Sequence, residues 1–251
     1  MRQPFYNIYS FCRTADDFAD ESASRDRAIE QLGQLQRDVD DLFAGRVPAH
    51  SFFPALADTV QSFGLEKGPF DDLISAFRQD QDVTRYTGQE PLLDYCSRSA
   101  NPVGRLLLQL ADCSNPTTRA LSDQICTGLQ LANFWQDVAR DYQIGRVYLP
   151  QDRCQAFGVS ESMLRGSETA APLRRLLAEL CDETEAYFRR GLPLVDHVPR
   201  WFAADVKLFA HGGLATLDAI RENQFDVIRR RPKVGKMKQL SLVARTMLGR
   251  L

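Results

Sequence analysis

Apolar residues recur at intervals of three and four along nearly the whole chain, and no segment alternates long enough to form a sheet. This is the period of an amphipathic α-helix, so we predict an all-α protein. With no internal repeat and no long linker, we expect one helical domain over residues 1–251. Proline and glycine separate the periodic segments. The expected helices span residues 4–22, 25–44, 51–63, 70–80, 90–112, 117–141, 171–191, 200–228 and 237–249.

Composition and charge narrow the classes of partner. A net charge of −2, with acids and bases mixed along most of the chain, gives no basic field for nucleic acid, so nucleic acid is not expected as a partner. Six cysteines without CxxC spacing favour a reducing, cytoplasmic compartment. No segment approaches the roughly 20 apolar residues that span a bilayer. We therefore expect a cytoplasmic protein that at most contacts the inner face of the membrane.

The same counts restrict the kind of metal site. Three histidines and no Cys/His cluster give little support to zinc. Any bound metal would have to be held by oxygen.

Three aspartates interrupt an otherwise apolar and aromatic segment near the start of the chain. Asp16, Asp17 and Asp20 follow Arg13 in the sequence RTADDFAD. At about 100° per residue, the three side chains fall within about 100° of arc on a helix, with Arg13 on the same side. We expect an acidic stripe on one face of the first helix.

A second polar stripe is expected on a distant helix. Gln130, Asn133, Asp137 and Asp141 recur at intervals of three and four residues, which places them on one side of a helix. The residues between them, such as Trp135, are mostly apolar and occupy the other sides. The second motif therefore repeats the arrangement of the first.

Two interpretations of the acidic stripes are open. Like charges four residues apart destabilise a helix, and ionised carboxylates in an apolar setting need a partner, so a bound cation is expected. Mg²⁺ takes oxygen ligands and joins one or two carboxylates to phosphates, which suits the heterolysis of an organic diphosphate. The other interpretation is a pair of solvated acidic surfaces. The pattern alone leaves both open.

The same residues carry a resemblance to a known family. The sequences RTADDFADE (13–21), NFWQDVARD (133–141) and GRVYLP (145–150) resemble the two aspartate-rich signatures of the squalene/phytoene synthases, and residues 95–104 extend the likeness. The resemblance implies a single-domain helical bundle of the class I isoprenoid synthase type, a cluster of two or three Mg²⁺ ions and no NAD(P)H. It implies metal ligands at Asp16, Asp17, Asp20, Asp137 and Asp141, and diphosphate contacts from Arg13, Gln130, Asn133, Arg146 and Tyr148.

Details within the family resemble the bacterial hydroxysqualene synthase branch. The sequence NFWQD stands at 133–137 and SANPVG at 99–104, where condensing synthases differ. This implies conversion of presqualene diphosphate and water to hydroxysqualene and diphosphate, on the route to hopanoids and in association with other enzymes of that route. We also consider that Ser97, Ser99 and Asn101 hold the water that quenches the cation. The alternative for these residues is a helix kink at Pro102 with satisfied serines.

Two rival functions stay open. One is head-to-head condensation of two prenyl diphosphates to phytoene, dehydrosqualene or presqualene diphosphate. The other is a non-catalytic assembly factor with the same fold. Only fifteen residues precede Asp16, fewer than the family pattern has, so we expect a truncated start or an open site with weak hydrolysis.

Four further segments have weaker signals. The basic run around Arg231 could approach a diphosphate or an anionic membrane, or be a solvated tail. Phe225 stands where the family often has tyrosine. The pair Arg85-Tyr86 resembles a family pair, or forms an Arg–aromatic surface stack. The segment HGG at 211–213 is expected to be a close-packing point.

Overall fold

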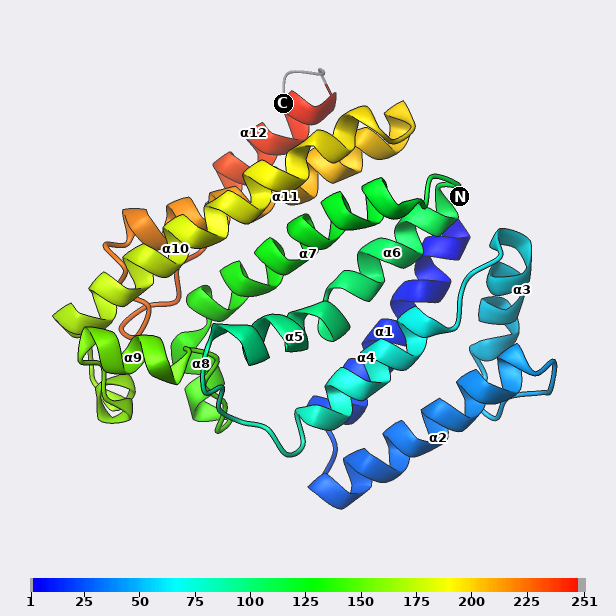
Figure 1. Ribbon diagram of the computed structural model, residues 1–251, viewed down its shortest axis with the longest axis horizontal. Helices are drawn as coiled ribbons and strands as arrows, with labels where there is room; N and C mark the ends of the chain where they lie inside the picture. The colour runs from blue at the N-terminus through cyan, green and yellow to red at the C-terminus, as the bar shows by residue number, and fades with distance from the viewer. Residues whose placement is uncertain (1, 248–251) are drawn as a thin grey trace. The chain divides into compact units, whose positions relative to one another are not determined.

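The computed structural model describes residues 2–247, and these residues form helices joined by loops (Figure 1). Within this range there is no β-strand, only an isolated bridge between Arg85 and Val147. The all-α prediction is confirmed. The α-helices are α1 Arg2–Asp20, α2 Arg25–Phe43, α3 Phe53–Phe63, α4 Gly68–Gln79, α5 Gln89–Ser99, α6 Asn101–Leu110, α7 Pro116–Gln136, α8 Val138–Gln143, α9 Gln151–Phe157, α10 Ala171–Gly191, α11 Arg200–Glu222 and α12 Lys236–Met247, with 3₁₀ helices η1 Glu161–Arg165 and η2 Leu192–Asp196.

The chain divides into two compact units. The N-terminal unit contains the residues up to Val83 together with Ser97–Arg119, and the C-terminal unit contains Thr84–Cys96 and the chain from Ala120 onward. Each unit therefore holds segments that are separated in the sequence. The single domain expected over residues 1–251 stays a prediction.

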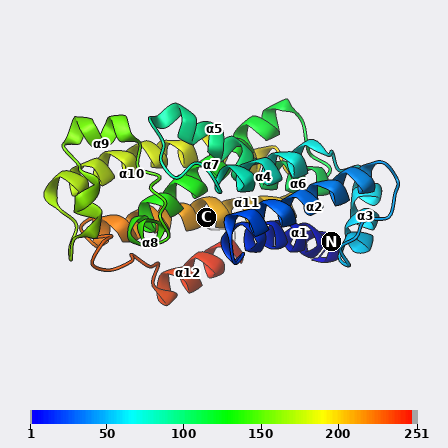
Figure 2. The same cartoon turned by 90° about the horizontal axis from the view of Figure 1, so that it is seen from below.

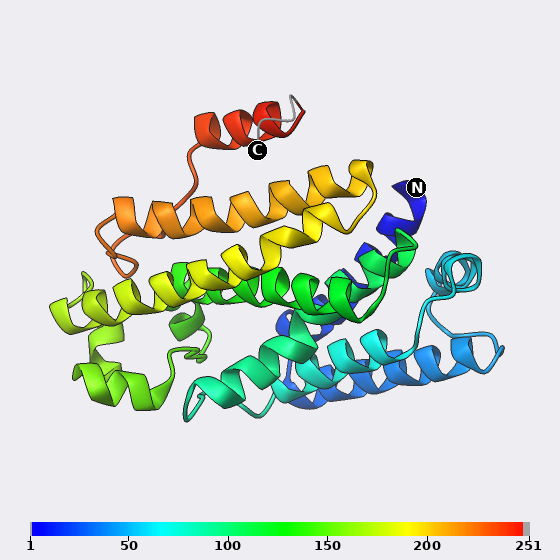
Figure 3. The ribbon, with the colours of Figure 1, turned by 45° about the horizontal axis from the view of Figure 1, so that its top comes forward.

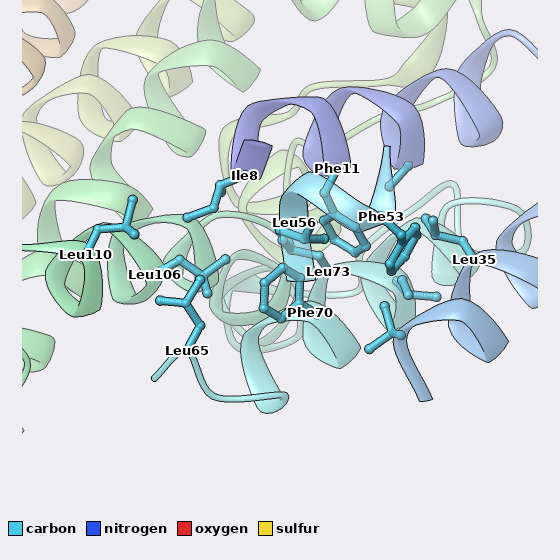
Figure 4. Close-up of a cluster of buried hydrophobic side chains, with 13 residues drawn as sticks. Ile8, Phe11, Leu35, Phe53, Leu56, Leu65, Phe70, Leu73, Leu106 and Leu110 are labelled. Carbon is cyan, nitrogen blue, oxygen red and sulfur yellow. The ribbon is translucent and has the colours of Figure 1, made fainter. Parts of the chain in front are cut away.

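The core of the N-terminal unit lies between α1, α2, α3, α4 and α6. Phe11 of α1 meets Phe70 of α4 edge to face, with ring centroids 4.9 Å apart, and Figure 4 shows both rings among the surrounding leucines. Burial of these side chains stabilises the unit by removing apolar surface from water. The core also fixes which face of α1 is turned outward.

A buried carboxylate fastens the loop between α2 and α3. Asp38 is fully buried on α2 and accepts hydrogen bonds from the backbone N–H groups of Ala49 and His50, at 3.0 and 2.9 Å. The His50 ring and the Gln34 amide contact its oxygens as well. A charge buried at this depth is tolerated because every oxygen has a donor.

The C-terminal unit is built on the long helices α7, α10 and α11. Phe188 of α10 is fully buried and lies against Gly213 of α11, where a Cβ atom would come within 2.2 Å of the ring. The ring also lies near Gly128 of α7, whose missing Cβ would be 3.1 Å away. The close-packing point predicted at 211–213 is therefore confirmed at Gly213.

The shorter helices of this unit lie along the long ones. Helix α9 lies beside α10, and α12 lies beside α11 (Figures 2 and 3). Helix α9 was not expected from the sequence. At seven residues it is too short to display a helical period.

Three expected helices end or break differently in the structure. The segment 90–112 divides at Ala100, because Pro102 lacks an N–H and cannot continue a helix through its own position. The segment 200–228 stops at Glu222, because Gln224 and Phe225 take left-handed φ angles of 53° and 58°. Positions 248 and 249 of the last expected helix lie outside the described residues.

The third departure is at the second acidic motif. The segment 117–141 is interrupted at Asp137, whose φ and ψ of −105° and 13° separate α7 from α8. The side chain of Asp137 is hydrogen-bonded to Arg231, and that of Gln136 to Arg231 and Pro232, which gives the kink a tertiary cause.

Candidate active site

The first acidic motif occupies the last turns of α1. Phe11, Ala15 and Ala19, four residues apart, are buried in the core of the N-terminal unit. This packing turns the opposite face outward, and Asp16 and Asp17 are there about two-fifths exposed. The predicted acidic stripe is confirmed as a helix face.

A guanidinium lies among these carboxylates. Arg13 Nη1 donates to Asp16 Oδ2 at 3.0 Å, and Nη2 lies 2.5 Å from Asp17 Oδ1 and 3.1 Å from Glu21 Oε1. Asp17 contributes most to raising the pKa of Arg13, and Asp16 and Glu21 add to it. Arg13, on the same helix, therefore supplies part of the positive charge that the acidic stripe was expected to need.

The second motif straddles the junction of α7 and α8. Leu131, Phe134, Trp135 and Val138 are buried, whereas Asn133 is exposed and Gln130 half-buried. Trp135 Nε1 donates to Thr184 Oγ1 of α10 at 2.8 Å, which fixes the rotation of α7 in the middle of the motif. The predicted division into polar and apolar sides is confirmed.

Asp137 is held by a residue from the end of the chain. Arg231 donates to both of its carboxylate oxygens, with Nη2 2.9 Å from Oδ2. Nη2 also donates to Gln136 Oε1 at 2.9 Å, and Gln136 Nε2 donates to the carbonyl oxygen of Pro232 at 2.8 Å. These bonds fasten residues 231 and 232 against the second motif. The hydrogen bond with Asp137 raises the pKa of Arg231.

Sequence reasoning missed this clamp. Its only signal was the basic run 229–233, for which three interpretations were open. The structure places one member of that run, Arg231, at an acid of the predicted site.

The loop after α8 is fastened to residues 84–86. Arg146 N donates to Asp141 O at 2.8 Å, which closes the end of α8. Arg85 Nη1 donates to Gly145 O at 2.6 Å, and its Nη2 pairs with Glu161 at 2.7 Å. Arg85 therefore positions the loop. Its guanidinium forms this ion pair with Glu161 and not the aromatic surface stack considered from the sequence.

Tyr148 belongs to a buried aromatic cluster of the C-terminal unit. Its ring stacks on Phe134 with centroids 3.8 Å apart and 10° between the planes. Tyr86 and Tyr95 complete the cluster, at 5.8 and 5.9 Å from Tyr148. The cluster holds the loop end against α7. Contact of Tyr148, Arg146, Gln130 or Asn133 with a diphosphate stays a prediction.

The donor chemistry fits a hard divalent ion. Each unit presents two aspartates four residues apart: Asp16 and Asp20 on α1 in one, and Asp137 and Asp141 at the junction of α7 and α8 in the other. Mg²⁺ typically takes only one or two protein carboxylates and completes its shell with phosphate and water. In residues 2–247, no three His, Cys, Asp or Glu side chains gather as a ready-made metal site. The meeting of the two sets around one metal cluster stays a prediction.

The all-helical fold and the two aspartate-rich motifs agree with one class of protein, the enzymes that act on isoprenoid diphosphates. The sequence profile described as "Squalene/phytoene synthase" matches residues 1–238, and the chain belongs to this family. Its members are prenyltransferase-type enzymes that condense isoprenoid diphosphates head to head, and they use a divalent metal to ionise the diphosphate. The family resemblance seen in the acidic motifs is confirmed.

The relatives are named after different products. The chain is 28% identical over 247 residues to a presqualene diphosphate synthase of Rhodopseudomonas palustris, covering 97% of this chain and 87% of the relative. It is 30% identical over 263 residues to a 15-cis-phytoene synthase of Synechococcus elongatus, covering 98% and 84%.

Solved structures agree on the fold. The squalene synthase HpnC from Alicyclobacillus acidocaldarius has 38% identity and a TM-score of 0.84, over 89% of this chain and 84% of that one. A dehydrosqualene synthase in complex with ligand has 26% identity and a TM-score of 0.89, over 98% and 86%. The isoprenoid synthase bundle is therefore the fold of this chain.

Proposed function

We propose that the chain converts presqualene diphosphate and water to hydroxysqualene and diphosphate. The carbon–oxygen bond to the diphosphate breaks, the cation rearranges, water adds its oxygen to carbon, and the proton leaves with the diphosphate. No electron is gained or lost overall, so the reaction needs no nicotinamide cofactor. Support comes from the family, from the 38% identity to a squalene synthase and from the two acidic motifs.

In this proposal both acidic motifs bind metal. Asp16 and Asp20, with Asp17 assisting, and Asp137 and Asp141 would hold the magnesium ions. When bound, Mg²⁺ supplies a positive charge that stabilises the leaving diphosphate. Arg13, Gln130, Asn133, Arg146 and Tyr148 would orient that diphosphate through hydrogen bonds.

One observation carries the choice of water as the final nucleophile. Ser99 Oγ, at the end of α5, is buried and has no hydrogen-bond partner within the described chain. A buried hydroxyl without a partner is costly, and an ordered water is the usual remedy. Ser99 is one of the three polar residues from which water capture was predicted. The kink near Pro102 is also present, and it leaves this serine unsatisfied.

A second candidate is head-to-head condensation of two prenyl diphosphates. The similarity to a presqualene diphosphate synthase and to a phytoene synthase favours it. A non-catalytic assembly role has less support, because a scaffold has no need to retain both acidic faces.

The decisive test supplies presqualene diphosphate or farnesyl diphosphate, with and without Mg²⁺, in ¹⁸O-labelled water, and identifies the extracted lipid. Labelled hydroxysqualene from presqualene diphosphate alone is the expected result. Consumption of farnesyl diphosphate alone would establish the condensing activity instead.

A variant tests the water site separately. Ser99→Ala should lower the share of alcohol among the products, whereas Ser241→Ala, exposed on α12, should leave it unchanged. An unchanged alcohol share in a triple replacement of Ser97, Ser99 and Asn101 would exclude the water role.

A further inference from the structure

Within the C-terminal unit, helix α12 packs by one side only. Lys238, Leu242 and Thr246, four residues apart, are its half-buried positions, and α12 contacts α11. Lys238 Nζ is 3.1 Å from Asp218 Oδ2 and 3.4 Å from Glu222 Oε1, both on α11. These bonds fix the rotation of α12 about its own axis.

The side turned away from α11 is mostly apolar, with Lys236 at its N-terminal end. Met237, Leu240 and Val243 are 80%, 65% and 44% exposed, and Ala244 is exposed beside them. At about 100° per residue, Met237, Leu240 and Ala244 point opposite to Leu242. We call Met237, Leu240, Val243 and Ala244 the α12 outer face. A soluble surface would place polar residues here.

Positive charge surrounds the outer face. Residues 229–247 contain seven lysines and arginines and no acid, in a chain whose net charge is −2. Arg231 and Lys238 are occupied by the ion pairs described above. Four more cations are exposed in the segment before the helix and at its first residue: Arg229, Arg230, Lys233 and Lys236.

We propose that α12 and the preceding basic segment dock the protein on an anionic lipid bilayer. A helix with an apolar face and basic flanks lies in the interface plane, with its apolar side chains among the acyl chains and its cations at the headgroups. No helix in residues 2–247 is long and apolar enough to cross a membrane, so the contact is a surface contact.

Charge complementarity selects the bilayer over the other occupants. A second copy of the same face would bring two strongly basic segments together, and like charges oppose that pairing. A nucleic acid would match the charge but leave the α12 outer face in water. An anionic bilayer satisfies both the apolar face and the cations, and the inference does not depend on which isoprenoid product the enzyme makes.

The experiment is sedimentation of the full chain with vesicles of phosphatidylcholine alone or of phosphatidylcholine mixed with phosphatidylglycerol. We expect binding to the anionic vesicles, weakened by salt. The double variant Met237→Asp/Leu240→Asp should lower the apparent partition coefficient at least about tenfold, and Lys233→Glu/Lys236→Glu should do the same.

Matched controls separate the site from general effects. Val47→Asp changes an apolar side chain that is 90% exposed in the N-terminal unit, and Arg175→Glu changes an exposed charge on α10. Both should bind vesicles like the wild type. Circular dichroism and Tm establish that each variant is folded, as expected for exposed positions.

Three outcomes would overturn the proposal. They are no binding of the wild type to anionic vesicles, equal loss in the controls and the α12 variants, and a wild-type dimer that Met237→Asp/Leu240→Asp converts to a monomer without vesicle binding.

Discussion

Arg231 binds both carboxylate oxygens of Asp137, a residue 94 positions earlier in the chain. The side chain of Asp137 is 14% exposed, and that of Arg231 is 44% exposed. The guanidinium of Arg231 is thus bound to a carboxylate that the family resemblance predicts to be a metal ligand. If Asp137 holds a metal ion as proposed, the metal and the guanidinium would compete for its carboxylate or share it.

Replacing this guanidinium should have two measurable effects. Arg231→Ala leaves a largely buried carboxylate without its donor, which should cost about 1–2 kcal/mol of unfolding free energy without metal. The same change removes a competitor, so Mg²⁺ should bind severalfold more tightly by calorimetry. Arg230→Ala, at an exposed neighbour, is the control. Equal stability and equal Mg²⁺ affinity in both variants would contradict the competition.

Asp16 of the first motif should be needed for catalysis and not for folding. If Asp16 holds Mg²⁺ as proposed, Asp16→Asn should lower kcat by about 100-fold or more, because the variant would hold less well the cation that stabilises the leaving diphosphate. Tm should change little, since the side chain is 43% exposed. The control is Asp26→Asn, at a side chain that is 94% exposed on α2. A Mg²⁺ titration of activity that is the same for Asp16→Asn and wild type would argue against a metal role.

The close contact between Phe188 and Gly213 should leave no room for a side chain at position 213. Gly213→Ala places a methyl group 2.2 Å from the ring, which should cost about 1–3 kcal/mol of unfolding free energy. Gly212→Ala in the same helix meets nothing within 4 Å, and it should be neutral or stabilise by up to about 1 kcal/mol. Urea unfolding measures both. Phe188→Leu should restore part of the loss in the Gly213→Ala background, and a similar cost for the two alanines would show that the close approach is unimportant.

The buried Asp38 should make stability fall in acid. Burial would raise the pKa of its carboxyl, but hydrogen bonds from Ala49, His50 and Gln34 outweigh burial and hold that pKa below the ordinary value of 3.8. A depressed pKa contributes stability at pH values above 3.8, and this contribution is lost as the pH falls through the lower, folded-state value.

Asp38→Asn should therefore cost about 1–3 kcal/mol near neutral pH, and its difference from the wild type should shrink in acid. Urea unfolding at several pH values measures this, with Asp58→Asn, exposed on α3, as control. A difference that is constant with pH would mean that the charge of Asp38 does not matter.

The helix faces could be predicted because they depend on local periodicity. Phe11, Ala15 and Ala19 repeat every four residues, and this repeat alone turns Asp16 and Asp17 outward. The polar stripe around Asn133 followed from the same reasoning. Features that depend on sequence-distant contacts could not be found in this way.

The break at Asp137 is the clearest example. Nothing in residues 117–141 ends a helix there, and the kink coincides with hydrogen bonds to residues 231 and 232. Likewise, the clamp of Arg85 on Gly145 joins segments that share no period. The acids of the candidate site were therefore predictable from local periodicity, and the distant residues Arg231 and Arg85 that fasten the site were not.

The division of the chain has a consequence for synthesis on the ribosome. Tyr86 and Tyr95 belong to the C-terminal unit, yet they are translated before residues 97–119 complete the N-terminal unit. Their aromatic partners, Phe134 and Tyr148, emerge later still. Two tyrosines that end up buried therefore stay uncovered after every residue of the N-terminal unit has been made, and this interval is when a nascent chain would most need a chaperone.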